Sequence, residues 1–468
     1  MSQQVINTSS QELQRRFGIQ RAYFDSGQTR PGAFRNKQLQ DLKAVIKSAE
    51  ADIIEALKKD FNKPAFETFA SEIGFIYEEL NYTRKHLAAW MKRRKVKTPL
   101  TAWPSQSYIL PQPKGVSLVI GPWNYPFQLM LAPVIAALAA GNTVILKPSE
   151  KTPATALLIE KLIHDNFPEG LLTVIQGEGH VVIPELLEQS RPDHLFFTGS
   201  VPVGRKIAEM TAPKLIPTTL ELGGKSPAII DYKVDMKTAV RRIAFGKWLN
   251  AGQTCVAPDY ILVDTSVEDE FLALMRSTLE EFYPEGALAS DSYAGLIDQN
   301  RFEAMQSYLK EGEVFYGGQA DADKLRLEPT IIRGVSLEDR VMQEEIFGPV
   351  LPVIPYSSED ELRAFLKANP NPLAFYVFSG RSNFSKRLLE DIPFGGGARN
   401  NALIHLANPR LPFGGIGDSG IGNYHGKYGF DTFTHYKGIM ESATWFDLKA
   451  KYPPYAGKAL RLIQRLMR

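Results

Sequence analysis

The sequence has a single cysteine and lacks several other features that would suggest a function at once. Cys255 is the only thiol in 468 residues, so an intrachain disulfide is excluded. Lys and Arg number 54 and Asp and Glu 52, and the resulting net charge of +2 gives no electrostatic reason to expect a nucleic-acid partner. The seven histidines form no HExxH pattern and no CxxC pair occurs, so no metal ion is expected.

Long hydrophobic segments are also absent. No run of about 18 apolar residues occurs, so no transmembrane span is expected. Residues 1–16 are polar and contain no apolar segment typical of a secretory signal. A lone thiol without a disulfide suits a reducing compartment. We therefore expect a cytoplasmic protein.

The sequence does contain a regular alternation of apolar strands and helices. Residues 36–59 and 66–94 have helical spacing of apolar residues. Strand-like runs alternate with helical ones from 115 to 224, and a second alternation runs from 227 to about 392. The fold class is therefore α/β: the first alternation predicts a parallel sheet with helices on both faces, and the second predicts a further α/β part. Residues 95–113 contain four prolines and predict an extended arm or hairpin.

Candidate ligand-binding residues follow the predicted strands of the first alternation, because open α/β sheets bind ligands beyond the carboxyl ends of their strands. Lys147 and Glu150 follow one strand, where they form either a solvated ion pair or a site for ribose hydroxyls. Gly199, Ser200 and Gly204 follow another strand and begin a helix. Backbone N–H groups there suit a pyrophosphate, although an ordinary helix start explains the same residues.

A literal GxGxxG motif occurs at Gly415, Gly417 and Gly420. The segment before it is a poor strand and the segment after it has no helical period, so the context of a phosphate-binding loop is missing. We expect this loop to pack near another part of the site.

Cys255 lies in the polar stretch NAGQTCVAPD, where it is either a nucleophile or a buried filler residue, and a lone cysteine is more often inert than catalytic. A nucleophilic thiol needs a donor for negative charge and a base. Asn124 offers an amide, and Glu221 ends a predicted buried strand. Each has an ordinary alternative, a turn residue for Asn124 and an ion-pair partner for Glu221.

Seven segments together resemble the aldehyde dehydrogenase superfamily, in the family's order and over most of the chain. Three of them also resemble the class 3 branch, which includes fatty and aromatic aldehyde dehydrogenases: PWNYP, the CVAPDY that begins at the cysteine, and YHGKYGF. The seven segments are PWNYP (122–126), LKPSE (146–150), FTGS (197–200), LELGGKSP (220–227), GQTCVAPDY (252–260), EEIFGPV (344–350) and LPFGGIGDSGIGNYHGKYGFDTFTH (411–435).

The resemblance implies a role for each candidate. Cys255 attacks the aldehyde to form a thiohemiacetal, Asn124 and the Cys255 N–H hold the oxyanion, and hydride transfer leaves a thioester that water, activated by Glu221, hydrolyses. Either Glu221 or a helix dipole is expected to assist thiolate formation. The implied cofactor-binding residues are Lys147 and Glu150 at one ribose, Gly199, Ser200 and Gly204 at the pyrophosphate, and Glu345, Phe347, Trp123 and Leu222 towards the nicotinamide.

The resemblance also implies the organisation of the chain. Residues 1–94 and 114–222 would form an NAD(P)-binding Rossmann-like domain, and residues 223–410 a catalytic domain. Segments 95–113 and 430–445 would form a small β arm for oligomerisation, which suggests a homodimer, and 446–468 a C-terminal tail. The cofactor is NAD or NADP, and a carboxylate at position 150 slightly favours NAD.

Other functions remain open. A coenzyme A-acylating dehydrogenase would pass the acyl group to a thiol rather than to water, and Glu221 argues for water. A cysteine esterase would need a histidine partner, and no histidine lies within 50 residues of Cys255. A non-catalytic scaffold is disfavoured because thiol, amide and carboxylate are all retained. Trp103, Tyr108 and Phe433 permit a hydrophobic substrate, medium- or long-chain or aromatic, without requiring one.

The last residues form a basic amphipathic segment. Leu460, Ile463 and Met467 fall near one helical face, with Arg461, Arg465 and Arg468 interspersed. This pattern predicts a helix that touches a membrane surface, closes the substrate entrance, or lies exposed without a partner.

Overall fold

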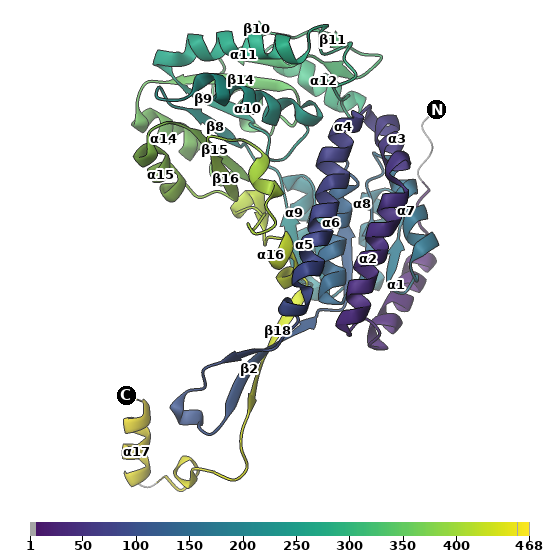
Figure 1. Ribbon diagram of the computed structural model, residues 1–468, viewed down its shortest axis with the longest axis vertical. Coiled ribbons are helices and arrows are strands. Elements are labelled where there is room, and N and C mark those ends of the chain that lie inside the picture. The colour runs from purple at the N-terminus through teal and green to yellow at the C-terminus, as the bar shows by residue number, and fades with distance from the viewer. Residues whose placement is uncertain (1–5, 456, 468) are drawn as a thin grey trace.

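The computed structural model describes residues 6–455 and 457–467. The chain begins with a run of helices (Figure 1). The predicted helix 36–59 is broken at Ala49, whose φ of −110° is not helical. The predicted helix 66–94 is interrupted by a π-helical turn, η1, and ends early because residue 94 begins the arm. The elements are α1 (Ser10–Asp25), α2 (Gly32–Ser48), α3 (Glu50–Phe61), α4 (Ala65–Thr68), η1 (Phe69–Ile73) and α5 (Gly74–Trp90).

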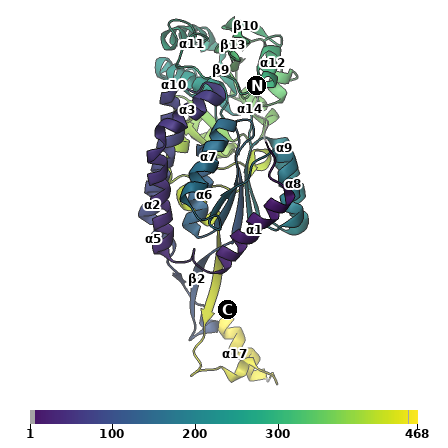
Figure 2. The same cartoon turned by 90° about the vertical axis from the view of Figure 1, so that its right-hand side faces the viewer.

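The first sheet has six strands in the order β17-β7-β6-β3-β4-β5. All its pairs are parallel except β17 with β7. Helices α6 and α7 cover one face and α1, α8 and α9 the other (Figure 2), which explains the continuous apolar strands. The bounds are β3 (Val116–Ile120), α6 (Gln128–Ala140), β4 (Thr143–Lys147), α7 (Pro153–Asn166), β5 (Leu172–Val174), α8 (Gly179–Gln189), β6 (His194–Thr198), α9 (Val201–Thr211), β7 (Thr218–Glu221), β17 (Gly420–Ile421) and α16 (Gly426–Thr432).

The second sheet has seven strands in the order β10-β13-β14-β9-β8-β15-β16, and only β10 is antiparallel to its neighbour. The prediction of an α/β fold with a Rossmann-like parallel sheet is therefore confirmed, and the second α/β part also contains a mostly parallel sheet. The bounds are β8 (Pro227–Ile230), α10 (Met236–Trp248), β9 (Tyr260–Asp264), α11 (Glu268–Phe282), α12 (Gln299–Tyr308), β10 (Glu313–Tyr316), β13 (Thr330–Arg333), α13 (Arg340–Gln343), β14 (Val350–Tyr356), α14 (Glu359–Ala368), β15 (Ala374–Phe378), α15 (Ser382–Asp391) and β16 (Gly396–Arg399), with a separate β11 (Ala320–Asp321) and β12 (Arg326–Leu327).

A three-stranded arm extends away from both sheets (Figure 1). It is formed by β1 (Arg94–Val96), β2 (Gln106–Pro113) and β18 (Thr434–Glu441), with β2 in the middle. Helix α17 (Gly457–Met467) lies at its far end and contacts the short helices η2 (Leu100–Ala102) and η8 (Lys449–Lys451). Within the described ranges, no helix has both the length and the apolar character needed to cross a bilayer.

The two sheets meet where β7 ends and β8 begins. Only residues 222–226 separate Glu221, the last residue of β7, from Pro227. One buried hydrophobic cluster runs from Val119 of the first sheet to Ile261 of the second. This junction places the carboxyl ends of the first sheet's strands opposite the loop that enters β9.

Candidate active site

The thiol lies in a sharply bent loop at this junction. Cys255 follows the short helix η4 (Leu249–Gly252), in which Asn250 and Ala251 have φ values of 56° and 52°. The side chain of Cys255 is half-buried and borders two cavities. We call the one of about 140 Å³ towards the first sheet the thiol cavity, and the one of about 190 Å³ on the other side the apolar cavity.

The local electrostatics of the thiol differ from expectation. Burial raises the pKa of Cys255, and the carboxyl groups of Glu345 and Glu221 raise it further. The backbone N–H groups of Cys255 and Val256 act in the opposite direction and lower the pKa. We expected Glu221 or a helix dipole to assist thiolate formation. An ionised Glu221 does the opposite, because its negative charge repels the thiolate and raises the pKa of Cys255.

Glu221 is buried at the end of β7 and lines the thiol cavity. Neither of its carboxyl oxygens has a hydrogen-bond partner among the described residues. Burial raises the pKa of Glu221 well above its ordinary value. An unpartnered buried carboxyl is costly, which makes Glu221 a candidate for proton exchange in this cavity.

Asn124 lies in the loop between β3 and α6 and also lines the thiol cavity. Its Nδ2 donates to the carbonyl oxygen of Gln253 at 3.0 Å, and Asn250 Nδ2 donates to the Asn124 carbonyl oxygen at 2.9 Å. Tyr125 and Thr254 share a hydroxyl–hydroxyl bond of 2.6 Å. Three contacts thus fix the amide loop against the cysteine loop.

The remaining predicted residues near the thiol line the same cavity. The rings of Trp123 and Phe347 meet edge to face, with centroids 5.3 Å apart, and Leu222 lies beside them in the wall. Glu345 also lines the cavity, where its carboxylate lies against Gly223 and accepts the Gly224 N–H. Burial, and then the charge of Asp259, raise the pKa of Glu345 to about 8.

A groove of about 790 Å³ continues from the thiol cavity along the first sheet, and we call it the cofactor groove. Gly199 and Ser200 line both spaces, at the N-terminus of α9. Lys147 and Glu150 line the far part and form an ion pair, and Glu150 Oε1 accepts the Gly179 N–H at 3.3 Å.

The residues that line the groove suit a dinucleotide, since backbone N–H groups of Gly199 and Ser200 lie at the start of a helix. A Cβ on Gly199 would lie 2.5 Å from the Phe197 ring, and one on Gly204 would lie 2.5 Å from Leu222. These two glycines are therefore required by close packing, and Gly204 is buried behind the groove instead of lining it. Thr198 adds a buried hydroxyl with no partner among the described residues.

The GIGDSG segment does not lie at a helix start of this kind. Its Gly420 pairs antiparallel with Glu221, and the Leu222 N–H donates to the Ser419 carbonyl oxygen at 3.1 Å. The loop therefore supports the strand that carries Glu221, next to the site.

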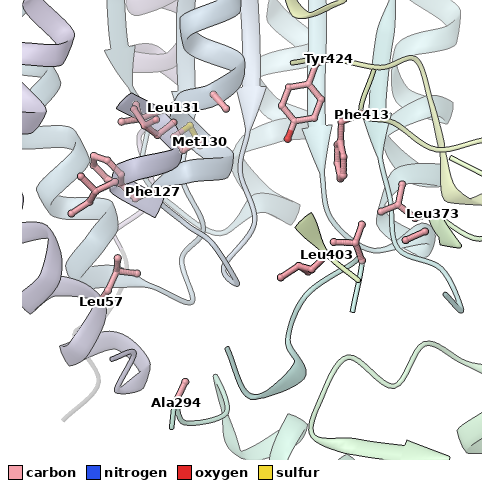
Figure 3. Close-up of a cluster of buried hydrophobic side chains, with 14 of the residues drawn as sticks. Leu57, Phe127, Met130, Leu131, Ala294, Leu373, Leu403, Phe413 and Tyr424 are labelled. Carbon is pink, nitrogen blue, oxygen red and sulfur yellow. The ribbon is translucent and has the colours of Figure 1, made fainter. Parts of the chain in front are cut away.

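The apolar cavity contains residues that the sequence did not single out. Tyr424 and Phe413 line both cavities, and the Tyr424 hydroxyl is buried without a partner among the described residues. Figure 3 shows these two rings next to each other. Both lie inside segment 411–435, which resembles the aldehyde dehydrogenase superfamily, so that resemblance could have pointed to these two residues. Further lining side chains are Phe66, Phe75, Tyr125, Leu129, Phe245, Leu403 and Ile404.

The aromatic residues first considered for a hydrophobic substrate lie elsewhere. Trp103 and Tyr108 belong to the arm, and Phe433 is fully buried in the core. Sequence position alone did not show that the arm carries the first two away from the thiol.

The fold and the site together define a class of enzyme. A thiol, an amide and a buried carboxyl border one cavity, and that cavity continues into a long groove at the carboxyl ends of a parallel sheet. No group of three or more metal-binding side chains occurs in the part of the chain that the structure describes. These features are those of a dinucleotide-dependent oxidoreductase with a cysteine nucleophile.

The chain belongs to the aldehyde dehydrogenase family, whose model matches residues 3–439. It is 44% identical to the 4,4'-diaponeurosporen-aldehyde dehydrogenase of Staphylococcus aureus, over 95% of this chain and 97% of that one. It is 40% identical to the dimeric, NADP-preferring aldehyde dehydrogenase of Canis lupus familiaris, over 94% and 97%. Relatives at 39–40% identity include family 3 members from Arabidopsis thaliana and Macaca fascicularis, as the class 3 resemblance predicted.

A solved structure agrees with this assignment. The substrate-bound state of Staphylococcus aureus AldH superimposes with a TM-score of 0.95 at 43% identity, covering 97% of this chain and 99% of that one. The protein is an aldehyde dehydrogenase that oxidises an aldehyde to the carboxylic acid and uses NAD or NADP.

Proposed function

We propose that this enzyme oxidises long, apolar aldehydes at Cys255. The observation that carries the proposal is the position of the thiol between the cofactor groove and a cavity lined by aromatic and aliphatic side chains. Burial of an alkyl chain in such a cavity is favourable by about 0.8 kcal/mol for each methylene group. The relative from Staphylococcus aureus is named for a diaponeurosporenal, and that name supports an apolar substrate here.

The proposed reaction assigns one step to each polar group. Once the Cys255 thiol has lost its proton, the thiolate sulfur bonds to the aldehyde carbon as the carbonyl π bond opens, and the oxygen that becomes negative is held by Asn124 Nδ2 and the Cys255 N–H. A bound nicotinamide supplies the acceptor for the hydride. Glu221 then removes a proton from water, the resulting hydroxide adds to the thioester carbon, and the carbon–sulfur bond breaks to release the acid.

We assign the cofactor residues by their places along the cofactor groove and the thiol cavity, and Gly204 by its place in the first turns of α9. Lys147 and Glu150 hold one ribose at its far end, Gly199, Ser200 and Gly204 border the pyrophosphate, and Glu345 binds the second ribose. Trp123, Leu222 and Phe347 contact the nicotinamide. We favour NAD slightly, because the carboxylate of Glu150 would repel a 2′-phosphate.

A substrate series tests the proposal directly. We expect kcat/KM to rise from acetaldehyde through hexanal to hexadecanal when NADH or NADPH formation is followed with each cofactor. Benzaldehyde tests an aromatic substrate, and Cys255→Ala should bind cofactor without oxidising any of them. Equal kcat/KM for all chain lengths would contradict the role of the apolar cavity.

Water, rather than coenzyme A, is the proposed acceptor of the acyl group. An unpartnered Glu221 in the thiol cavity supports this choice, since thiolysis does not need that base. Identification of the free acid with and without coenzyme A checks it. An acyl-coenzyme A product would favour the acylating alternative, and ester cleavage with no reduced cofactor formed would favour a cysteine esterase.

We also propose a homodimer assembled through the arm. The outer edge of β18 pairs with no strand among the described residues, and the named dimeric relative supports this state. A sedimentation mass of one 52.3 kDa chain would contradict it.

We propose that the two domains meet between residues 222 and 223. Helix α16 and strand β17, which come later in the chain, return to the first sheet. A free catalytic thiol supports a cytoplasmic location.

The far end of the arm is our candidate for peripheral membrane contact. Residues 92–97, which lead from α5 into the arm and run along its edge strand β1, contain five basic residues and no acidic one, and α17 at the far end adds Lys458, Arg461 and Arg465. Trp445, Trp103 and Leu460 are 73%, 58% and 61% exposed there. Exposed tryptophans beside basic residues suit the surface of an anionic membrane. Arg468, part of the predicted basic face, lies outside the described residues.

A further inference from the structure

A buried charge cluster lies next to the active site, in the stretch of chain from the end of α3 to η1. We define the carboxylate clamp as Lys63, Glu67 and Glu72, which are 1%, 7% and 0% exposed. Lys63 Nζ donates to Glu72 Oε1 at 2.6 Å and lies 3.9 Å from the centre of the Tyr125 ring. Such a cluster is expensive to bury, so its contacts deserve a functional explanation.

Glu72 holds the loop that carries Asn124. Its Oε2 accepts the backbone N–H groups of Phe127 at 2.9 Å and Gln128 at 3.1 Å. These residues immediately follow Asn124 and Tyr125 and lead into α6. The carboxylate therefore fixes the start of α6 and, with it, the direction of the amide loop.

Glu67 holds the loop that carries the thiol. Its Oε2 accepts the Asn250 N–H at 2.9 Å. Asn250 has a positive φ, and its side chain donates to the Asn124 and Gln253 carbonyl oxygens. Glu67 thus stabilises a backbone conformation that costs energy for a residue other than glycine.

The π-helical turn explains how two glutamates five residues apart face the same way. In a regular α-helix, positions 67 and 72 would point about 140° apart. The turn Phe69–Ile73, which the Gly74 N–H closes onto the Phe69 carbonyl oxygen, brings positions i and i+5 onto one face. Phe66, Ala70 and Ser71 line the apolar cavity from the same stretch of chain.

We propose that the carboxylate clamp sets the spacing between the Asn124 amide and the Cys255 sulfur. This inference rests on the proposed function, since it assumes that these two groups act on one carbonyl. Lys63, Glu67 and Glu72 are positioning residues that touch neither substrate nor cofactor. They hold the oxyanion donor and the nucleophile to one rigid turn, which also borders the substrate's apolar chain.

The test compares Glu67→Ala with Glu67→Gln, because glutamine keeps an oxygen that can accept the Asn250 N–H. We expect Glu67→Ala to slow the first turnover, measured as the rate of the NADH burst, by about tenfold or more, since small misplacements of reacting groups are costly. The rate at which iodoacetamide alkylates Cys255 in this variant should differ from that of the wild type as well. The Kd for the cofactor, measured by fluorescence quenching, should stay within about twofold of the wild-type value. Glu67→Gln should restore most of the burst rate.

Asp231→Asn is the matched control. Asp231 is another fully buried carboxylate, paired with Arg381 at 2.6 Å, but it follows β8 at the end opposite the junction. The Asp231→Asn variant should have a lower Tm than the wild type and an unchanged burst rate. If Glu67→Ala lowers Tm but leaves the burst rate and alkylation unchanged, or if Glu67→Gln fails to restore them, the clamp is merely structural. Loss of a Cys255-dependent burst in the wild type would instead contradict the proposed function itself.

Discussion

Three residues show how proton chemistry is arranged around the thiol. Backbone N–H groups favour the Cys255 thiolate, whereas burial and two carboxyls oppose it. Glu221 favours its neutral form in the free protein because burial raises its pKa. A neutral Glu221 does not repel the thiolate, but it must release its own proton before it can accept one from water as a base.

The first prediction concerns Glu221→Gln. We expect this variant to retain a burst of about one NADH per active site, because hydride transfer precedes hydrolysis of the thioester. Steady turnover should fall by roughly 100-fold or more, the usual contribution of a general base. Stopped-flow absorbance separates the two phases. If the burst disappears together with turnover, Glu221 acts before hydride transfer.

The second prediction concerns Glu79, which accepts the Gly426 N–H at 2.7 Å. Burial raises the pKa of Glu79 from 4.5 to about 7. A carboxyl with a raised folded-state pKa stabilises the fold below its unfolded pKa, and this contribution is lost as pH rises through the folded pKa. Glu79→Gln, neutral at every pH, should therefore gain about 2 kcal/mol relative to wild type between pH 5 and pH 8.

Urea unfolding at the two pH values measures this difference. The exposed Glu55 provides the matched control, and Glu55→Gln should track the wild type at both pH values. A free-energy difference between Glu79→Gln and wild type that does not change with pH would show that Glu79 is ionised throughout.

At the scale of elements, the sequence predicted the sheets better than the helices around them. Continuous apolar strands identify buried parallel sheets directly, and the residues at their carboxyl ends fall where a ligand binds. The carboxylate clamp was not predictable in this way. Lys63, Glu67 and Glu72 have the spacing of ordinary solvated charges on an amphipathic helix, and only the packing of α4, η1 and α5 against two loops buries them.

The third prediction concerns helix α17 and the arm. Removal of residues 456–468 should reduce co-sedimentation with anionic phosphatidylserine vesicles by several-fold, because both basic charge and apolar surface are lost. Oxidation of hexanal should stay unchanged, since the main contacts of α17 among the described residues, with η2 and η8, lie at the end of the arm. Neutral phosphatidylcholine vesicles are the lipid control. Equal binding of the full-length and the truncated protein to the anionic vesicles would contradict the proposed membrane contact of α17.

At the scale of the whole molecule, the thiol is accessible from two sides. The cofactor groove reaches it through the thiol cavity, and the apolar cavity reaches it from the other direction. Cofactor and substrate therefore need not compete for one entrance. Among the residues that the structure describes, Cys255, Leu129, Phe413 and Tyr424 are the ones that border both cavities.

The fourth prediction follows from this arrangement. Alkylation of Cys255 by N-ethylmaleimide should proceed with saturating cofactor at a rate within about threefold of the free enzyme, because the apolar cavity remains open. Ala70→Trp, which fills that cavity, should slow alkylation by about tenfold or more in the presence of cofactor. Mass spectrometry of the intact protein measures both rates. Complete protection of wild-type Cys255 by cofactor alone would contradict two-sided access.

The single cysteine has a consequence for the enzyme under oxidative stress. Peroxide converts an accessible thiolate to a sulfenic acid, which is normally rescued by condensation with a nearby thiol. This chain contains no second sulfhydryl that could serve as the resolving partner. Recovery of an oxidised molecule therefore depends on a small thiol such as glutathione entering through one of the two openings.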